Sequence, residues 1–475
     1  MTGLSIITKE SIITQAPTTK SLLSSLYQRE ELPLFGKEGQ GEIFRRKCLI
    51  NYGLISNLIK KPHIKTVTHT LVVLLFLYFL MPSGLPAQIT GPGTGNIKAG
   101  PVEVHPFVEL TETYSDNIYK NYGGFEKEAD FITTLSPGIR LILPVKTHSL
   151  QLDYRADINW YSKNSETDYT NQIGGGLIKL EFPRGLSFNF SDYLTHAVIP
   201  RKAKETPGIS GAADPNRELP YNGNDFNAMG KYRFLDRWAF EARYNNYDYR
   251  YTHDDDKIGN FNRDTVGGSL YYSLTPKIDA LADYNFSTVE YKTAENNDNT
   301  NHSAYLGLAF DPTAKLNGYL KLGWVLKNYD KDLENRDNSF STYSTLIGLN
   351  YSLSSYHIFN LKGNRIIEED VDTNAPVITT DVSLGYRYIL IWYEKISINT
   401  HVGYLTKKFK GATTDADGTF KKRDDKSWYG GAGIAYAPQP WLSFSLNYIY
   451  TNDDSNFINY NYGENRVYLR ASIAF

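Results

Sequence analysis

The sequence is poor in sulfur-containing residues. Its 475 residues include three methionines and a single cysteine, Cys48. One cysteine excludes an intrachain disulfide, and because Cys48 precedes the most apolar segment, the rest of the chain has no thiolate chemistry. Such low use of cysteine suits a protein that matures in an oxidising compartment.

The sequence also lacks a segment that could cross a membrane as a helix. The one strongly apolar run, Thr70–Leu80, is far shorter than the ~20 residues that a spanning helix needs. The mean hydropathy of -0.42 is too polar for a bundle of such helices. A net charge of -2 provides no basic excess, so nucleic acid is not an expected partner.

The apolar run has the flanks of a secretory signal peptide. Lysines precede it and small residues follow it, with Ala87 at the predicted cleavage site. An uncleaved anchor is the alternative. The segment before it shows no consistent periodicity, and we interpret it as an extension upstream of the true translation start, with an unusually long basic region as the other reading. The predicted parts are 1–59, a non-structural extension; 60–87, the signal peptide; 88–101, a short periplasmic segment; and 102–475, the folded domain.

The last ten residues, Arg466–Phe475, alternate strictly between apolar and other side chains. Such alternation predicts a strand with one apolar face. A chain that ends on an aromatic residue in such a strand resembles bacterial outer-membrane β-barrels, whose last strand is recognised by the barrel-assembly machinery. By this resemblance Tyr468 and Phe475 form the assembly signal. An aromatic content of 14%, with 37 tyrosines, agrees, because such barrels carry aromatic girdles.

From Val102 onward, amphipathic stretches long enough for tilted membrane strands of ~9–11 residues alternate between tight turns and longer polar loops. The tight turns are predicted at Leu143–His148, Pro183–Gly185, Leu235–Arg237, Thr275–Lys277, Asp311–Lys315, Leu353–Ser355, Ile389–Trp392 and Pro438–Pro440. The polar loops are predicted near 116–128, 163–168, 200–222, 252–262, 292–301, 329–338, 369–376, 407–427 and 452–462. These connections predict about eighteen strands, with both chain ends on the periplasmic side.

The predicted fold class is all-β: a transmembrane antiparallel up-and-down β-barrel. Within Leu150–Trp160, for example, the even positions are apolar and would face lipid, whereas the odd positions are polar and would face inward. Alternation alone also fits a soluble sandwich. Strand length favours the barrel, since soluble strands average ~5–6 residues and a closed barrel exposes no edge.

The interior of a barrel of this size is too wide to be filled by its own wall, which predicts an aqueous channel. Its predicted lining carries both signs of charge, which indicates either a solvated, cross-paired wall or a hydrogen-bonding path for a polar polymer. Small solutes fit such a wall equally well. The candidate lining residues are Asp153, Arg155, Asp157, Arg233, Glu241, Arg243, Asp279, Asp283, Lys321, Arg387 and Arg470.

Three other patterns have a simpler explanation than a binding or catalytic site. The tyrosine cluster Tyr244–Tyr251 suits an interfacial aromatic belt better than a ligand platform. The acidic loop His253–Asp256 lacks the 6–8 oxygen ligands of a calcium site, and Asp415–Gly418 is too short to be an EF-hand. His196, with Asp192 nearby, has no identifiable catalytic partner on a second strand. We therefore predict no catalytic residue, no metal and no cofactor.

The start of the predicted barrel contains the motif Y-x-D-N, formed by Tyr114, Asp116 and Asn117. Together with the barrel length and the closing phenylalanine, it resembles the family of outer-membrane β-barrel porins found with exopolysaccharide and exosortase systems, over residues 100–475. The resemblance implies passage of a secreted polysaccharide. Asp116 and Asn117 suit the first extracellular turn, where such side chains bond their own backbone.

The sequence thus leads us to expect an exopolysaccharide-export conduit in the outer membrane of a Gram-negative bacterium. The alternatives are a general or sugar-selective diffusion porin and a structural or adhesive barrel that displays loops such as 200–222 and 407–427. The expected partners are outer-membrane lipid, lipopolysaccharide and the barrel-assembly machinery. Export would also need the polysaccharide and a separate periplasmic partner, because the segment 88–101 is too short for a periplasmic repeat domain.

Overall fold

The structure is a computed structural model that describes residues 97–121, 126–199, 219–253, 259–292, 298–311, 314–330, 339–370 and 375–475. The predicted extension 1–59 and signal peptide 60–87 lie outside the described residues, as does most of 88–101. In the described ranges, no helix is both long and apolar enough to span a membrane.

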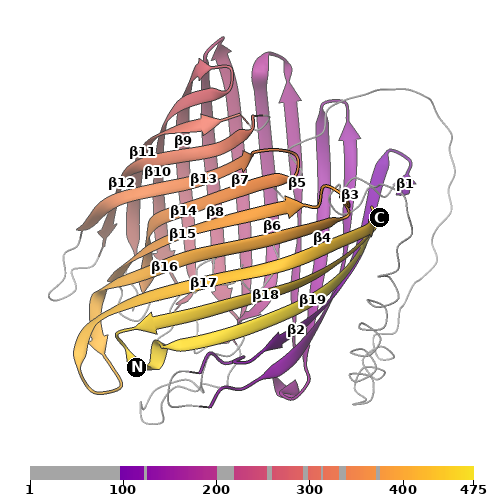
Figure 1. The fold of residues 1–475 in the computed structure, drawn as a ribbon. Helices are drawn as coiled ribbons and strands as arrows, with labels where there is room; N and C mark the ends of the chain where they lie inside the picture. The colour runs from indigo at the N-terminus through magenta and orange to yellow at the C-terminus, as the bar shows by residue number, and fades with distance from the viewer. Residues whose placement is uncertain are drawn as a thin grey trace. The chain divides into compact units, whose positions relative to one another are not determined.

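Eighteen antiparallel strands of the described chain close into one barrel (Figure 1). Each pairs with its sequence neighbours, and β19 closes the barrel by pairing with β2. The short β1 (Ile97–Ala99) pairs with the start of β2. The barrel strands are β2 Val102–Ser115, β3 Asp130–Val145, β4 His148–Tyr161, β5 Tyr169–Phe182, β6 Leu186–Ile199, β7 Leu219–Leu235, β8 Trp238–Tyr251, β9 Phe261–Thr275, β10 Ile278–Tyr291, β11 Asn299–Phe310, β12 Leu316–Tyr329, β13 Ser339–Ser352, β14 His357–Asp370, β15 Ala375–Ile389, β16 Ile396–Thr414, β17 Phe420–Gln439, β18 Leu442–Ser455 and β19 Tyr462–Ala474.

The barrel strands have the length that a tilted crossing of a bilayer requires. The shortest, β11, has 12 residues and the longest, β17, has 20, whereas soluble strands average ~5–6. Closure satisfies the backbone where water is absent, which an open sheet could not do. The predicted fold class and the count of about eighteen strands are confirmed.

Tight turns join the strands at one end of the barrel, as the sequence pattern predicted. Two of them contain a residue in the left-handed backbone region, Lys146 with φ 57 and Arg184 with φ 67. Both ends of the barrel chain lie at this end, because Ala474 pairs with Phe107 near the start of β2. We refer to it as the periplasmic end and to the opposite end as the extracellular end.

The predicted loop 407–427 is wrong. β16 and β17 continue through most of it and are joined by a tight turn at Gly418, which has φ 84. This hairpin extends beyond its neighbours (Figure 1). There neither face needs to be apolar, and Lys421 and Arg423 instead form ion pairs along the hairpin. The polar sequence of these strand ends therefore led to the prediction of a loop.

Two other predicted loops are shorter than expected. β7 begins at Leu219, inside the predicted loop 200–222, and β18 continues to Ser455, inside 452–462. In both places the polar end of the strand extends beyond the lipid-facing band. The alternation of apolar residues therefore ends earlier than the backbone pairing of the strand.

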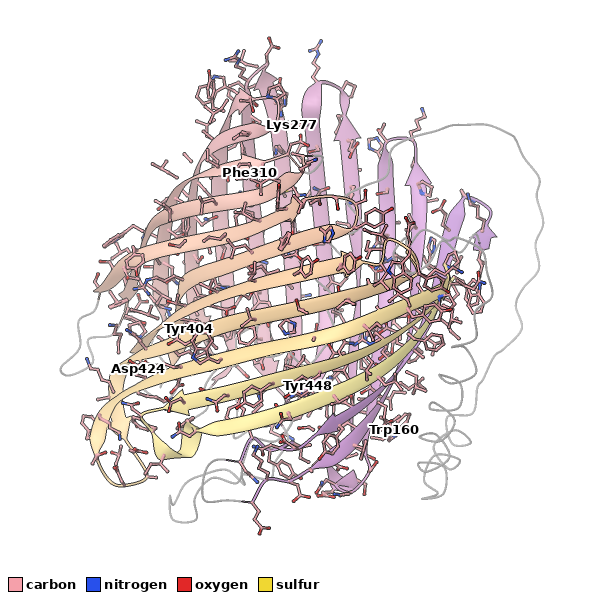
Figure 2. All side chains as sticks on the ribbon, in the orientation of Figure 1. Trp160, Lys277, Phe310, Tyr404, Asp424 and Tyr448 are labelled. Carbon is pink, nitrogen blue, oxygen red and sulfur yellow. The ribbon has the colours of Figure 1, made fainter. Side chains whose placement is uncertain are left out.

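The two faces of the wall differ as alternation predicted. On β4, Leu152 and Tyr154 are 48% and 46% exposed on the outside, whereas Gln151, Arg155 and Asn159 are buried on the inside. The register also places the labelled aromatics of Figure 2 on the outward face: Trp160, Phe310, Tyr404 and Tyr448. Rings at the boundary between apolar and polar surface form the girdles of a membrane barrel.

The interpretation of Tyr244–Tyr251 as an aromatic belt is correct only for its first member. Tyr244 is 38% exposed on the outside, but Tyr249 and Tyr251 are buried on the inward face. Tyr249 stacks between Tyr221 and Phe261, with ring centroids at 4.6 and 5.7 Å. These rings form a packed inner cluster near the extracellular end, because they share the odd-numbered face of β8 with the lumen charges.

Candidate functional site

All eleven charged residues predicted to line the lumen lie on one face of the wall. Opposed residues of neighbouring strands point to the same side, so the register assigns each residue to a face. Contacts between strands two apart, such as Arg155 of β4 with Glu109 of β2, identify this face as the concave one. The eleven are Asp153, Arg155, Asp157, Arg233, Glu241, Arg243, Asp279, Asp283, Lys321, Arg387 and Arg470.

Arg155 is the centre of a polar network on the inner face of β2–β4. Its guanidinium lies 3.3 Å from Glu109 and 2.7 Å from Asp157, and Nη2 donates to the Ser136 hydroxyl at 3.3 Å. The side chain of Arg155 is only 10% exposed. Three strands therefore hold this cation against the wall, with a carboxylate on either side.

Asp153 is held in a second, adjoining group. It accepts a hydrogen bond from Arg140 Nε at 2.6 Å and another from the Tyr193 hydroxyl at 3.0 Å. The Gln151 amide donates to the same carboxylate at 2.6 Å. A charge with this many donors is fixed in position rather than free to follow a passing solute.

A third group forms on β8–β12. Arg243 donates to Glu241 and Ser269, each at 2.6 Å, and to Asp283 at 2.7 Å. Lys321 also forms an ion pair with Asp283, whose side chain is 3% exposed. Two cations and two carboxylates make the group nearly neutral and rigid.

Four of the predicted residues are not drawn into these groups. Arg387 donates from Nε to the Asn399 side chain at 3.0 Å, and Arg470 donates to Thr111 at 3.2 Å. Arg233 and Asp279 lie near the periplasmic turns, and within the described ranges neither forms an ion pair. Their charges face the periplasmic entrance of the lumen.

Sequence analysis missed several residues that complete the networks. Glu109 alternates with Val108 and Leu110 on the first strand, so the same period-2 signal could have identified it. Ser136 and Tyr193 carry no such signal. They are recognised only through contacts between strands that the sequence does not pair locally.

The Y-x-D-N motif joins the first strand of the barrel to the last. Asp116 accepts hydrogen bonds from the Asn465 backbone N–H and side-chain amide, both at 2.7 Å. Asn117, which is fully buried, donates to the Gly463 carbonyl at 3.2 Å and accepts from the Asn121 backbone at 2.7 Å. Asn117 thus bonds its own loop as predicted, but Asp116 bonds β19 instead.

The electrostatics of Asp116 fit this role. Burial raises its pKa, but the hydrogen bonds from Asn465 and the positive charge of Lys127 outweigh burial, so its pKa lies below the usual value. Tyr114, the first motif residue, faces outward and packs on Phe131 with ring centroids 5.0 Å apart. The motif therefore serves barrel closure in this structure.

The terminal aromatic is also fixed at closure. The Phe475 backbone N–H donates to the Pro106 carbonyl at 3.0 Å, and its ring stacks on Trp441 at 6.0 Å. Tyr468 faces the lumen, with the Arg470 guanidinium 5.9 Å from its ring. Their role as an assembly signal stays a prediction.

The rejected catalytic and metal candidates form no site in the described ranges. His196 and Asp192 point outward and bond Asn222 and Asn224 instead of each other. The Asp417 carboxylate caps a turn, where hydrogen bonds from Thr419 lower its pKa. Those ranges contain no group of three potential metal ligands. Most of the loop His253–Asp256 lies outside the described residues.

Residues 93–475 match the model of the family described as "Putative beta-barrel porin 2". The chain belongs to this family. It is a porin-like β-barrel of the Gram-negative outer membrane, in agreement with the closed wall and its polar lining. Export of an exopolysaccharide and cleavage near Ala87 stay predictions.

Several solved outer-membrane barrels are similar in structure at low sequence identity. OccK2 (OpdF) of Pseudomonas aeruginosa, also crystallised with glucuronate, has a TM-score of 0.43 and 11% identity over 79% of this chain and 98% of its own. OccAB3 of Acinetobacter baumannii has a TM-score of 0.41 and 14% identity over 79% and 99%. The FrpB iron transporter of Neisseria meningitidis has 0.41 and 10% over 73% and 62%. No curated protein matches the chain significantly.

Proposed function

We propose that this porin is a diffusion channel for small polar solutes. The observation that carries the proposal is the two sets of ion pairs on the inner face, one on β2–β4 and one on β8–β12, which fix charges of both signs there. Barrels of 16–18 strands leave an aqueous channel. Fixed, paired charges make such a channel wettable without giving any single solute a deep binding site.

Export of an exopolysaccharide is the second candidate, and it rests on the resemblance of the Y-x-D-N motif. In the structure, the side chains of Asp116 and Asn117 bond Asn465 and Gly463 where the barrel closes. The motif therefore does not favour a polymer over a small solute. Lipid, lipopolysaccharide, the barrel-assembly machinery and a periplasmic export partner stay predicted partners.

The test is single-channel conductance of the protein purified from outer membranes and inserted into a planar bilayer. A diffusion channel gives a steady current that added exopolysaccharide does not change. A current that only the host's exopolysaccharide blocks would favour export. A silent barrel would contradict both functions.

A charge variant tests whether the inner wall is the path. Asp283→Asn leaves Arg243 and Lys321 without their shared carboxylate, so the reversal potential in a salt gradient should shift toward anion selectivity. Asp264→Asn is the matched control, because Asp264 bonds Tyr244 on the outer face. Equal reversal potentials in the two variants would place the ion path elsewhere.

A further inference from the structure

β13 and β14 pair along only part of their length. Their register begins at Ser352↔Ile358 near the periplasmic end and stops at Thr345↔Arg365. Beyond that point, residues 339–344 of β13 pair with β12 alone, and residues 366–370 of β14 pair with β15 alone. The barrel wall is therefore split at its extracellular end.

The split begins at the outer aromatic girdle. Tyr343 and Trp324 are opposed on β13 and β12 and are 57% and 55% exposed on the outer face. Below them the ladder between β13 and β14 is intact, as the absence of water in the hydrocarbon layer requires. Above them the unpaired backbone can reach water and lipid headgroups.

The side chain of Arg365 occupies the split. By register Arg365 faces outward, and its guanidinium lies 4.1 Å from the ring centroid of Tyr343. Its Nη2 nevertheless donates to the hydroxyl of Thr342, a residue of the inner face, at 3.0 Å. The guanidinium thus passes between the strands, and its buried Nε has no hydrogen-bond partner in the described ranges. A buried donor without a partner is unfavourable, so this arrangement is open to exchange.

The extracellular tip of the β14–β15 hairpin is covered on both faces. Residues 376–379 are buried in succession, although alternate residues of a wall strand face outward. Ile378, on the outward face, is 5% exposed, and the inward-facing Val377 is 3% exposed. A tip that leaned outward would expose both faces, so this burial excludes an outward lean.

A contact between β13 and β16, the strands on either side of the hairpin, lies across the tip. Lys410 of β16 lies with Nζ 5.5 Å from the ring centroid of Phe340 on β13. Three strand spacings separate these strands, about 14 Å along a regular wall. The extended side chains of Lys410 and Phe340 span most of this distance, so their contact lies across the hairpin that stands between the two strands.

We propose that the described part of the β14–β15 tip, Ile366–Glu368 with Pro376–Thr379, is a movable gate at the mouth of the channel. In the state seen, Arg365 fills the split and the tip narrows the mouth. In the second state Arg365 leaves the split, and the existing register extends to Ser344↔Ile366, Tyr343↔Ile367 and Thr342↔Glu368. The tip then rejoins the wall and the mouth widens. Because the register is extended and not shifted, no side chain changes face.

Cysteine trapping tests this gate, which rests on the proposed channel function. In a Cys48→Ser background, Thr342→Cys with Glu368→Cys places two thiols opposite each other only in the second state, in which β13 and β14 pair at these residues. Opposed residues of an antiparallel pair lie ~4.5–5.5 Å apart, within the range for a disulfide. Leu346→Cys with Asn364→Cys is the matched control, because these residues are already opposed on the same seam.

We expect the disulfide at 342 and 368 to form under mild oxidation of the full-length protein in bilayers, and to raise single-channel conductance until a reductant is added. The control disulfide should form readily and leave conductance unchanged. No disulfide at 342 and 368, or a disulfide without a rise in conductance, would overturn the gate. Disulfide formation is read on a gel, so a silent wild-type barrel would contradict the channel function separately from the movement of the seam.

Discussion

Two seams of this barrel, β19 with β2 and β13 with β14, have short ladders of backbone pairs. They differ in the side chains that take the place of the missing pairs. At the first, Asp116 and Asn117 continue the contact from the loop with hydrogen bonds to Asn465 and Gly463. At the second, a guanidinium with an unsatisfied Nε fills the space. A seam that side-chain hydrogen bonds continue beyond its ladder is fixed, whereas one filled by a replaceable side chain can exchange.

The largest effect on stability is expected from a substitution at the seam of β19 with β2. Asn117→Ala removes a buried amide and leaves the Asn121 N–H and the Gly463 carbonyl without their partner. The free energy of unfolding should fall by about 2–3 kcal/mol. Urea titration in lipid vesicles measures it, with Asp248→Ala as a control, because the ion pair of Asp248 with Arg250 is on the outer surface. A loss no greater than that of the control would mean that the motif does not stabilise closure.

A smaller effect is expected at the second seam. Arg365→Met removes the hydrogen bond to Thr342 and the contact of the guanidinium with the Tyr343 ring, but it also removes the buried Nε that has no partner, and the methionine side chain can still pack on that ring. The two contributions oppose each other, so the free energy of unfolding should change by less than about 1 kcal/mol. The conductance record should change more than stability does, with more frequent steps to the wide level. Equal destabilisation by Arg365→Met and Asn117→Ala would contradict the conclusion that the two seams differ in how firmly they are held.

The pH dependence of stability sharpens the comparison further. The folded-state pKa of Asp116 is lowered, so its contribution to stability is present above the unfolded pKa of ~3.9 and is lost as pH falls through the folded value. Asp116→Asn should therefore lower the urea midpoint at pH 7 and 5, and the difference from wild type should shrink near pH 3. A difference that stays constant down to pH 3 would show that the charge of Asp116 does not matter.

The smallest effect on stability is expected from Asp248→Ala, the control substitution. Asp248→Ala breaks an ion pair with Arg250, whose side chain is 60% exposed. Surface pairs contribute ~0–1 kcal/mol, so the urea midpoint should hardly move. A loss comparable with that of Asn117→Ala would mean that any polar change at the extracellular rim destabilises the barrel.

The wall could be predicted from the sequence because its signals are local. Alternation in Leu150–Trp160 assigns each residue to a face, and tight turns such as Pro183–Gly185 mark where strands reverse. Prediction failed where local signals stop. The ends of β16 and β17 extend beyond the lipid-facing band, and their polar sequence led to the prediction of a loop. Tyr249 and Tyr251 were predicted to belong to an aromatic belt, although they are buried on the inward face.

Neither seam could have been predicted from the sequence. The bond from Asp116 to Asn465 joins residues far apart in the chain, and nothing near Ile366 distinguishes a strand that leaves its neighbour from one that stays. The partner strand, and not the residue itself, decides whether a ladder continues. The groups around Arg155 and Arg243 likewise depend on strands two apart, so their charges could be placed on a face but not paired.

Hydrogen–deuterium exchange of the protein in lipid nanodiscs tests the difference between the two seams most directly. Those amides of 339–344 and 366–370 that point into the split should exchange within the fast phase of the experiment, because the ladder between β13 and β14 is absent there, whereas the amides that bond β12 and β15 should be protected. The amides of 107–115 and 466–474 should stay protected at the same times. Equal protection of the two seams would contradict the conclusion that one is fixed and the other is movable.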